Sequence, residues 1–122
     1  MKTILLAEDE EPTIALFQAM VAGHPQWRLL IARTGGEALA FAIRERPDVA
    51  LLDIQLPAPD GLEVCRAIKT APETAGTYVL MVSAMTQAAS RAEAAAAGAD
   101  DFVAKPFSTT ELTELLVSNL GA

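Results

Sequence analysis

The chain is poor in cysteine, in basic residues and in long apolar runs, and each shortage excludes a class of protein. Cys65 is its single cysteine, which rules out an internal disulfide and fits a reducing, cytoplasmic environment. Nine Lys and Arg residues face sixteen Asp and Glu residues, for a net charge of −7. The basic residues are spread thinly and form no stripe that could follow a phosphate backbone. We therefore expect no direct binding to nucleic acid.

Apolar residues make up 52% of the chain, but they occur in short runs broken by charge. None approaches the roughly 20 residues that a membrane-spanning helix needs, so we expect no membrane association. No basic segment precedes a hydrophobic stretch at the start, which argues against a signal peptide. The chain has 122 residues and shows no linker, low-complexity tract or internal repeat. We expect a single domain over residues 1–122.

Five short apolar runs alternate with five segments of helical length. The apolar runs cover residues 3–7, 27–32, 49–53, 77–82 and 102–104. The helical segments cover about 11–22, 35–45, 61–70, 87–97 and 109–120. Strict alternation of this kind predicts an α/β fold of βαβ units, with a parallel sheet covered on both faces.

Acidic residues stand where two of the apolar runs end. Glu8 and Asp9 follow the first run, and Asp53 closes the third. The carboxyl ends of parallel strands meet at one edge of a sheet, so these three carboxylates should share a small volume. Like charges repel at that range unless a hard divalent cation or a cationic side chain neutralises them. The sequence thus predicts a Mg²⁺ site, and Lys105, after the fifth run, offers a cation as well.

Each of these residues also has a simpler explanation when it is considered alone. Asp53 could serve as a turn or cap residue, and an acidic pair after a strand is favourable at the start of a helix through the helix dipole. Ser83, at the end of the fourth run, is of a type that often caps a helix. Glu10 and Glu11 fit the helix-dipole explanation best, and we assign them no role at the site.

Four segments carry a resemblance to a known family: ILLAEDEEP, VALLDIQLPAPDG, VLMVSA and ADDFVAKPF. Together they resemble the signature segments of the response-regulator receiver domain, in order and in spacing, from Lys2 to Leu120. The resemblance implies a doubly wound, five-stranded parallel sheet of flavodoxin-like (βα)5 type with strand order 2-1-3-4-5, similar to the chemotaxis regulators. It also implies a switch in two-component, or phosphorelay, signal transduction rather than a turnover enzyme.

The resemblance implies roles for the acidic residues. Asp53 would accept a phosphoryl group from a histidine kinase or a histidine phosphotransfer protein and become an aspartyl phosphate. Glu8, Asp9, Asp53 and the backbone carbonyl of Gln55 would hold Mg²⁺ or Mn²⁺ through oxygen ligands. Gln55 and Met85 would flank the path of attacking water. Since Met85 cannot position water by hydrogen bonding, we expect the loss of the phosphoryl group to be not especially fast.

The resemblance also implies how the phosphoryl group is held and read. Lys105 and Ser83 would bind its oxygens. Ser83 and Phe102 would form the switch, and the Lys105-Pro106 peptide bond would be cis. The output surface would comprise the fourth helix, fifth strand and fifth helix, and would act on a downstream protein or domain. The protein would be a monomer or a phosphorylation-dependent homodimer, and either a stand-alone regulator or one domain of a longer protein.

Three other classes fit less well. A flavodoxin-like cofactor binder would carry a glycine- and hydroxyl-rich loop after the first strand, where this chain has the acidic EDEE. A haloacid-dehalogenase-type phosphatase would place its nucleophile there in a D-x-D arrangement, where this chain reads Glu8-Asp9-Glu10. A degenerate receiver that only binds partners would normally have lost Asp53 or Lys105, and both are present.

Overall fold

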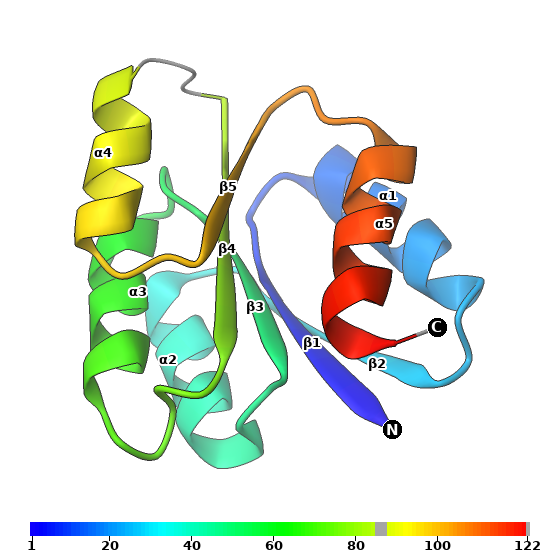
Figure 1. Ribbon diagram of the computed structural model, residues 1–122, viewed down its shortest axis with the longest axis horizontal. Helices are drawn as coiled ribbons and strands as arrows, with labels where there is room; N and C mark the ends of the chain where they lie inside the picture. Colours follow the sequence, from blue (N-terminus) through cyan, green and yellow to red (C-terminus); the bar gives the residue numbers. More distant parts are fainter. Residues whose placement is uncertain (85–87, 122) are drawn as a thin grey trace.

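The computed structural model describes residues 1–84 and 88–121, in which five strands alternate with five helices (Figure 1). The strands are β1 (Lys2–Ala7), β2 (Trp27–Ala32), β3 (Val49–Asp53), β4 (Tyr78–Ser83) and β5 (Asp101–Ala104). The helices are α1 (Glu11–Ala22), α2 (Gly35–Glu45), α3 (Gly61–Thr70), α4 (Ala88–Ala96) and α5 (Thr109–Leu120). These bounds confirm the predicted alternation. In the described part of the chain no helix is both long and apolar enough to pass through a bilayer.

The five strands form one parallel sheet in the order β2-β1-β3-β4-β5, as predicted. The chain starts on β1, next to the edge of the sheet, moves outward to the edge strand β2, and then crosses back over β1 to the central strand β3. The order therefore reverses between β1 and β3. In open parallel sheets, ligands bind beyond the carboxyl ends of the strands at such a reversal.

Helices cover both faces of the sheet, with α1 and α5 on one face and α2, α3 and α4 on the other (Figure 1). Residues of β1 alternate between the two cores. Ile4 and Leu6 pack on the side of α1 and α5, whereas Leu5 and Ala7 pack on the side of α2 and α3. All five residues of β3 are buried, which explains its continuous apolar run. The polar ends of these central strands are thus held on a rigid support.

Helix α3 begins with a complete capping box. The Asp60 carboxylate accepts a hydrogen bond from the Glu63 N–H, and the Glu63 carboxylate accepts one from the Asp60 N–H. At α2 only half of the motif forms, because Thr34 accepts from the Glu37 N–H but the Glu37 carboxylate turns to the Arg33 N–H. Both helix starts are defined by local hydrogen bonds between residues three or four positions apart in the chain.

The start of α3 also packs tightly against the backbone that follows β3. A Cβ added to Gly61 would lie 2.2 Å from the Asp53 carbonyl oxygen, which only a glycine avoids. The Gly61 N–H donates to the Ile54 carbonyl at 3.3 Å. A similar contact occurs at α2, where a Cβ on Gly35 would lie 1.8 Å from the Pro59 carbonyl oxygen. The starts of α2 and α3 therefore both pack closely against the backbone of the loop that follows β3.

Candidate functional site

Three of the predicted site residues meet where their strands end. Glu8 follows β1, Asp53 is the last residue of β3, and Lys105 follows β5. The Lys105 Nζ atom lies 2.7 Å from Glu8 Oε1 and 3.2 Å from Asp53 Oδ2. The parallel sheet thus brings together residues that are as much as 97 positions apart in the chain.

The two carboxylates are buried, and each of their oxygens has a partner. Glu8 is 1% exposed and Asp53 is 5% exposed. The second oxygen of Glu8 accepts a hydrogen bond from the Glu10 N–H at 3.2 Å. The second oxygen of Asp53 accepts one from the Gln55 N–H at 2.9 Å. Each carboxylate therefore faces Lys105 with one oxygen and is oriented by a backbone N–H through the other, as buried charges require.

The charges of this cluster are strongly interdependent. Burial raises the pKa of Glu8 above its ordinary value; the hydrogen bond from Lys105 opposes that rise, and the Asp53 carboxylate adds to it. Burial lowers the pKa of Lys105, but its hydrogen bond to Glu8 and the negative charge of Asp53 outweigh that effect, so the pKa of the ammonium group is raised. Lys105 is consequently a permanent cation, and it neutralises part of the charge of the buried carboxylates.

Glu10, to which we assigned no role from the sequence, is a third acidic partner of Lys105. Its Oε1 atom lies 3.1 Å from Lys105 Nζ, and its side chain is 63% exposed. Carboxylate oxygens of Glu8, Glu10 and Asp53 all lie within 4.8 Å of one another. Glu10 occupies the N-cap position of α1 but makes no side-chain capping bond. N-cap positions favour Ser, Thr, Asp or Asn, so a glutamate at this position was a sequence signal that Glu10 has a role other than capping.

Two further metal ligands were predicted, the Asp9 carboxylate and the Gln55 carbonyl. Asp9 is exposed, and its carboxylate is not among the three that cluster. Gln55 has an exposed side chain and contributes its N–H to Asp53. The use of the Asp9 carboxylate and of the Gln55 carbonyl as metal ligands stays a prediction.

The residues predicted to hold and read a phosphoryl group lie along β4 and β5. Ser83 is fully buried, and its carbonyl accepts a hydrogen bond from the Lys105 N–H at 2.7 Å. The Lys105-Pro106 peptide bond is cis. Phe102 is half-buried, and the guanidinium carbon of Arg91, on α4, lies 4.7 Å from its ring centroid. The prediction that involves Met85 lies outside the described residues.

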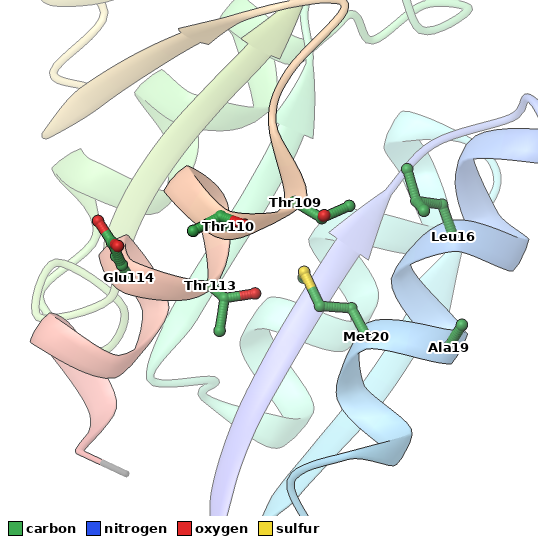
Figure 2. A pocket seen from close by; sticks show the side chains of 7 residues that line it. All are labelled: Leu16, Ala19, Met20, Thr109, Thr110, Thr113 and Glu114. Atoms are coloured by element: carbon green, nitrogen blue, oxygen red, sulfur yellow. The ribbon is translucent and has the colours of Figure 1, made fainter.

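Two hollows flank α1, and only one of them adjoins the acidic group. The first has a volume of 430 Å³, and Glu10, Lys105, Pro106 and Phe107 are among its lining residues. The second, of 490 Å³, runs between α1 and α5 and is lined by Leu16, Ala19, Met20, Thr109, Thr110, Thr113 and Glu114 (Figure 2). Its lining contains one charged group and none of the residues of the acidic group, so the candidate chemistry belongs to the first hollow.

The residues at the strand ends suit a hard divalent cation. Three carboxylates from Glu8, Glu10 and Asp53 converge within a few ångströms, and all offer oxygen ligands. Mg²⁺ and Mn²⁺ prefer oxygen ligands and keep several waters, so they need few protein groups. The ion pairs of Lys105 with all three carboxylates indicate that these oxygens require a positive partner.

Residues 4–117 match the family model of the response regulator receiver domain. The chain belongs to this family. Receiver domains are signalling switches of two-component systems rather than turnover enzymes, and phosphorylation with Mg²⁺ is a general feature of the family. TcrX, a probable transcriptional regulatory protein of Mycobacterium tuberculosis, is 37% identical over 108 residues, which cover 88% of this chain and 45% of TcrX. This chain spans less than half the length of the curated relatives it matches.

Solved structures of metal-bound relatives share the fold of this receiver domain. The receiver domain of the sensor histidine kinase PA1611 from Pseudomonas aeruginosa, with a magnesium ion coordinated in its active-site cleft, superposes with a TM-score of 0.88 at 29% identity, covering 99% of this chain and 98% of that one. The Mn²⁺-bound form of the response regulator Rcp1 superposes with a TM-score of 0.83 at 26% identity, covering 97% of this chain and 93% of that one.

Proposed function

We propose that this receiver domain accepts a phosphoryl group on Asp53 in a Mg²⁺-dependent reaction. The observation that carries the proposal is the buried Asp53 carboxylate, which ends β3 beside Glu8 and has one oxygen on Lys105. The donor is a phosphohistidine of a histidine kinase or a histidine phosphotransfer protein. A carboxylate oxygen of Asp53 attacks the phosphorus, a P–O bond forms, and the P–N bond to the donor breaks as the histidine nitrogen regains its electron pair.

The acidic residues prepare the site for this reaction. Glu8, Asp9, Asp53 and the Gln55 carbonyl would hold Mg²⁺ or Mn²⁺, which offsets the negative charge of the carboxylates and of the phosphoryl oxygens. Asp53 itself is oriented, because the Gln55 N–H fixes Oδ1 and directs Oδ2 towards Lys105. Positioning and neutralisation are the main demands of phosphoryl transfer, so these residues supply most of what it needs.

Lys105 and Ser83 hold the transferred group. The Lys105 ammonium leaves the carboxylates and pairs with a phosphoryl oxygen, forming a charge-assisted hydrogen bond. The Ser83 hydroxyl would bind another phosphoryl oxygen, and the hydrogen bond from the Lys105 N–H to the Ser83 carbonyl keeps the two residues side by side. The movement of the Ser83 hydroxyl frees space into which the Phe102 ring rotates.

The rotation of Phe102 would alter the surface formed by α4, β5 and α5. This surface would then bind a downstream output protein or domain, or a second copy of the chain. The absence of a basic stripe and the lone buried cysteine support a cytoplasmic switch that does not bind nucleic acid itself. We place this function in a single receiver domain over residues 1–122.

Intact-mass measurement tests the proposal. The protein is incubated with a small-molecule phosphodonor such as phosphoramidate, with Mg²⁺ and with a chelator in its place. We expect the mass of one phosphoryl group to appear only with Mg²⁺, and only when Asp53 is present. The Asp48→Asn variant is a matched control, because this aspartate lies on the loop before β3 at the opposite end of the strand. An equal gain of mass in Asp53→Asn, or no gain in the wild type, would overturn the proposal.

A further inference from the structure

We propose that Glu10 is a positioning residue, which keeps the Lys105 ammonium at the mouth of the site when Glu8 and Asp53 turn to a divalent cation. The inference rests on the function proposed above and adds a residue to it. Glu10 and Lys105 both line the 430 Å³ hollow beside the acidic group. Both side chains therefore border the same opening next to Asp53.

The three carboxylates around Lys105 are not equivalent. The side chains of Glu8 and Asp53 are 1% and 6% exposed, whereas that of Glu10 is 63% exposed. A divalent cation and an ammonium group cannot share the same buried oxygens without repulsion. Glu8 and Asp53 would therefore be lost to Lys105 in the loaded site. Glu10 is the partner that Lys105 can keep.

The local structure of α1 favours this role over helix capping. The Glu10 carboxylate makes no capping bond at the start of α1, and the Glu10 N–H donates to Glu8 Oε2. Glu11 already supplies an acidic group in the first turn, and it pairs with Arg33, which follows β2. The Glu10 side chain thus does not cap α1, and Glu11 is the acidic residue of its first turn. Glu10 is therefore available to pair with Lys105.

Holding Lys105 matters because its side chain is long and flexible. A lysine that loses its partners regains the rotamer freedom of a four-carbon chain, and the ammonium group then spends time in water. With Glu10 in place, Nζ stays near the Asp53 carboxylate, on which the phosphoryl group forms, even after its own pairing with Asp53 Oδ2, at 3.2 Å in this structure, is lost to the cation. The ammonium group can then pair with a phosphoryl oxygen without a further loss of side-chain rotamer freedom.

Nuclear magnetic resonance of the lysine side chains tests this inference directly. The chain has three lysines, Lys2, Lys69 and Lys105, so a protein with labelled lysine gives a simple spectrum. In Mg²⁺-saturated wild type, we expect the two ε-protons of Lys105 to stay inequivalent, as in an immobilised side chain. In Glu10→Gln they should average like those of a free lysine. The Glu11→Gln variant removes the same charge one residue away and should resemble the wild type.

A second measurement follows the rate of phosphorylation by phosphoramidate at saturating Mg²⁺. We expect Glu10→Gln to be slower than Glu11→Gln by about 2- to 5-fold, the range that an exposed ion pair supports. The inference is overturned if the two ε-proton signals of Lys105 become equivalent when Mg²⁺ is added to the wild type. It is also overturned if these signals are the same in Glu10→Gln and in the wild type. If they do so while the wild type still gains a phosphoryl group, the proposed function stands. A wild type that gains none overturns the function itself.

Discussion

Lys105 is a single positive charge shared by three carboxylates, two of them buried. Its ion pairs with Glu8 and Asp53 replace the water that these groups lose on folding. The same groups are those expected to bind a cation and a phosphoryl group. At the scale of one residue, a single ammonium group therefore affects both the stability of the protein without metal and the phosphoryl transfer proposed for Asp53.

The Lys105→Met substitution measures how much this ammonium group contributes to stability when no metal is bound. It leaves Glu8 and Asp53 buried without their cation, which for a fully buried pair costs about 3–5 kcal/mol. The Lys105 side chain is 13% exposed, so water can enter part of the vacated space. We expect the free energy of unfolding to fall by about 1–3 kcal/mol at pH 7 in the presence of a chelator.

Urea denaturation with and without Mg²⁺ measures this effect. Mg²⁺ should stabilise Lys105→Met more than it stabilises the wild type, because the variant has no internal cation to displace. Lys69→Met is a useful control, since Lys69 pairs with Asp100 away from the site. Equal stabilisation of all three proteins by Mg²⁺ would contradict this account of Lys105.

At the scale of elements, the predictable features were those encoded in short stretches of chain. β3 appears as a continuous apolar run because both of its faces are covered, and the start of α3 is marked by Asp60 and Glu63. The contact of Arg91 with Phe102 joins α4 to β5 and depends on how a long side chain lies after packing. The Glu10–Lys105 pair was missed for the same reason, since local pattern does not record where a flexible side chain ends.

Gly61 links one element to the site and carries a prediction of its own. A Cβ at this position would overlap the backbone of Asp53 and Ile54, so α3 or the end of β3 must shift. We expect Gly61→Ala to lower the free energy of unfolding by about 1–3 kcal/mol, as overpacking does.

The matched control for Gly61→Ala is Gly76→Ala, where an added Cβ meets nothing within 4 Å. That variant should be neutral or more stable by about 0.4–1 kcal/mol, because alanine restricts the unfolded chain. Both values follow from urea denaturation. If the Gly61→Ala variant is as stable as the Gly76→Ala variant, the start of α3 does not pack against the backbone after β3 as closely as described.

At the scale of the whole molecule, Cys65 reports on the integrity of the fold. Its thiol is fully buried on α3, and its S–H donates to the Ala97 carbonyl at 3.5 Å. Burial raises the pKa of Cys65 to about 11. The folded protein therefore holds this proton more tightly than the unfolded chain does, and stability falls as pH rises from the ordinary thiol pKa towards 11.

We expect Cys65 to resist iodoacetamide at pH 8 in the native protein and to react at once in urea. The rate of native alkylation, measured by mass, should follow the fraction of unfolded molecules and should rise in Gly61→Ala. Rapid alkylation of the native wild type would contradict the packing of α3 and α4 around this residue.

The central claim is that the strand ends form a Mg²⁺-dependent acceptor in which Asp53 alone takes the phosphoryl group. Borohydride reduction tests it at the level of the residue, because it converts an aspartyl phosphate to homoserine, which peptide mass spectrometry can locate. After incubation with phosphoramidate and Mg²⁺, we predict homoserine at position 53 and nowhere else, and none when a chelator replaces Mg²⁺. Homoserine at another acidic position, or at position 53 without Mg²⁺, would contradict the claim.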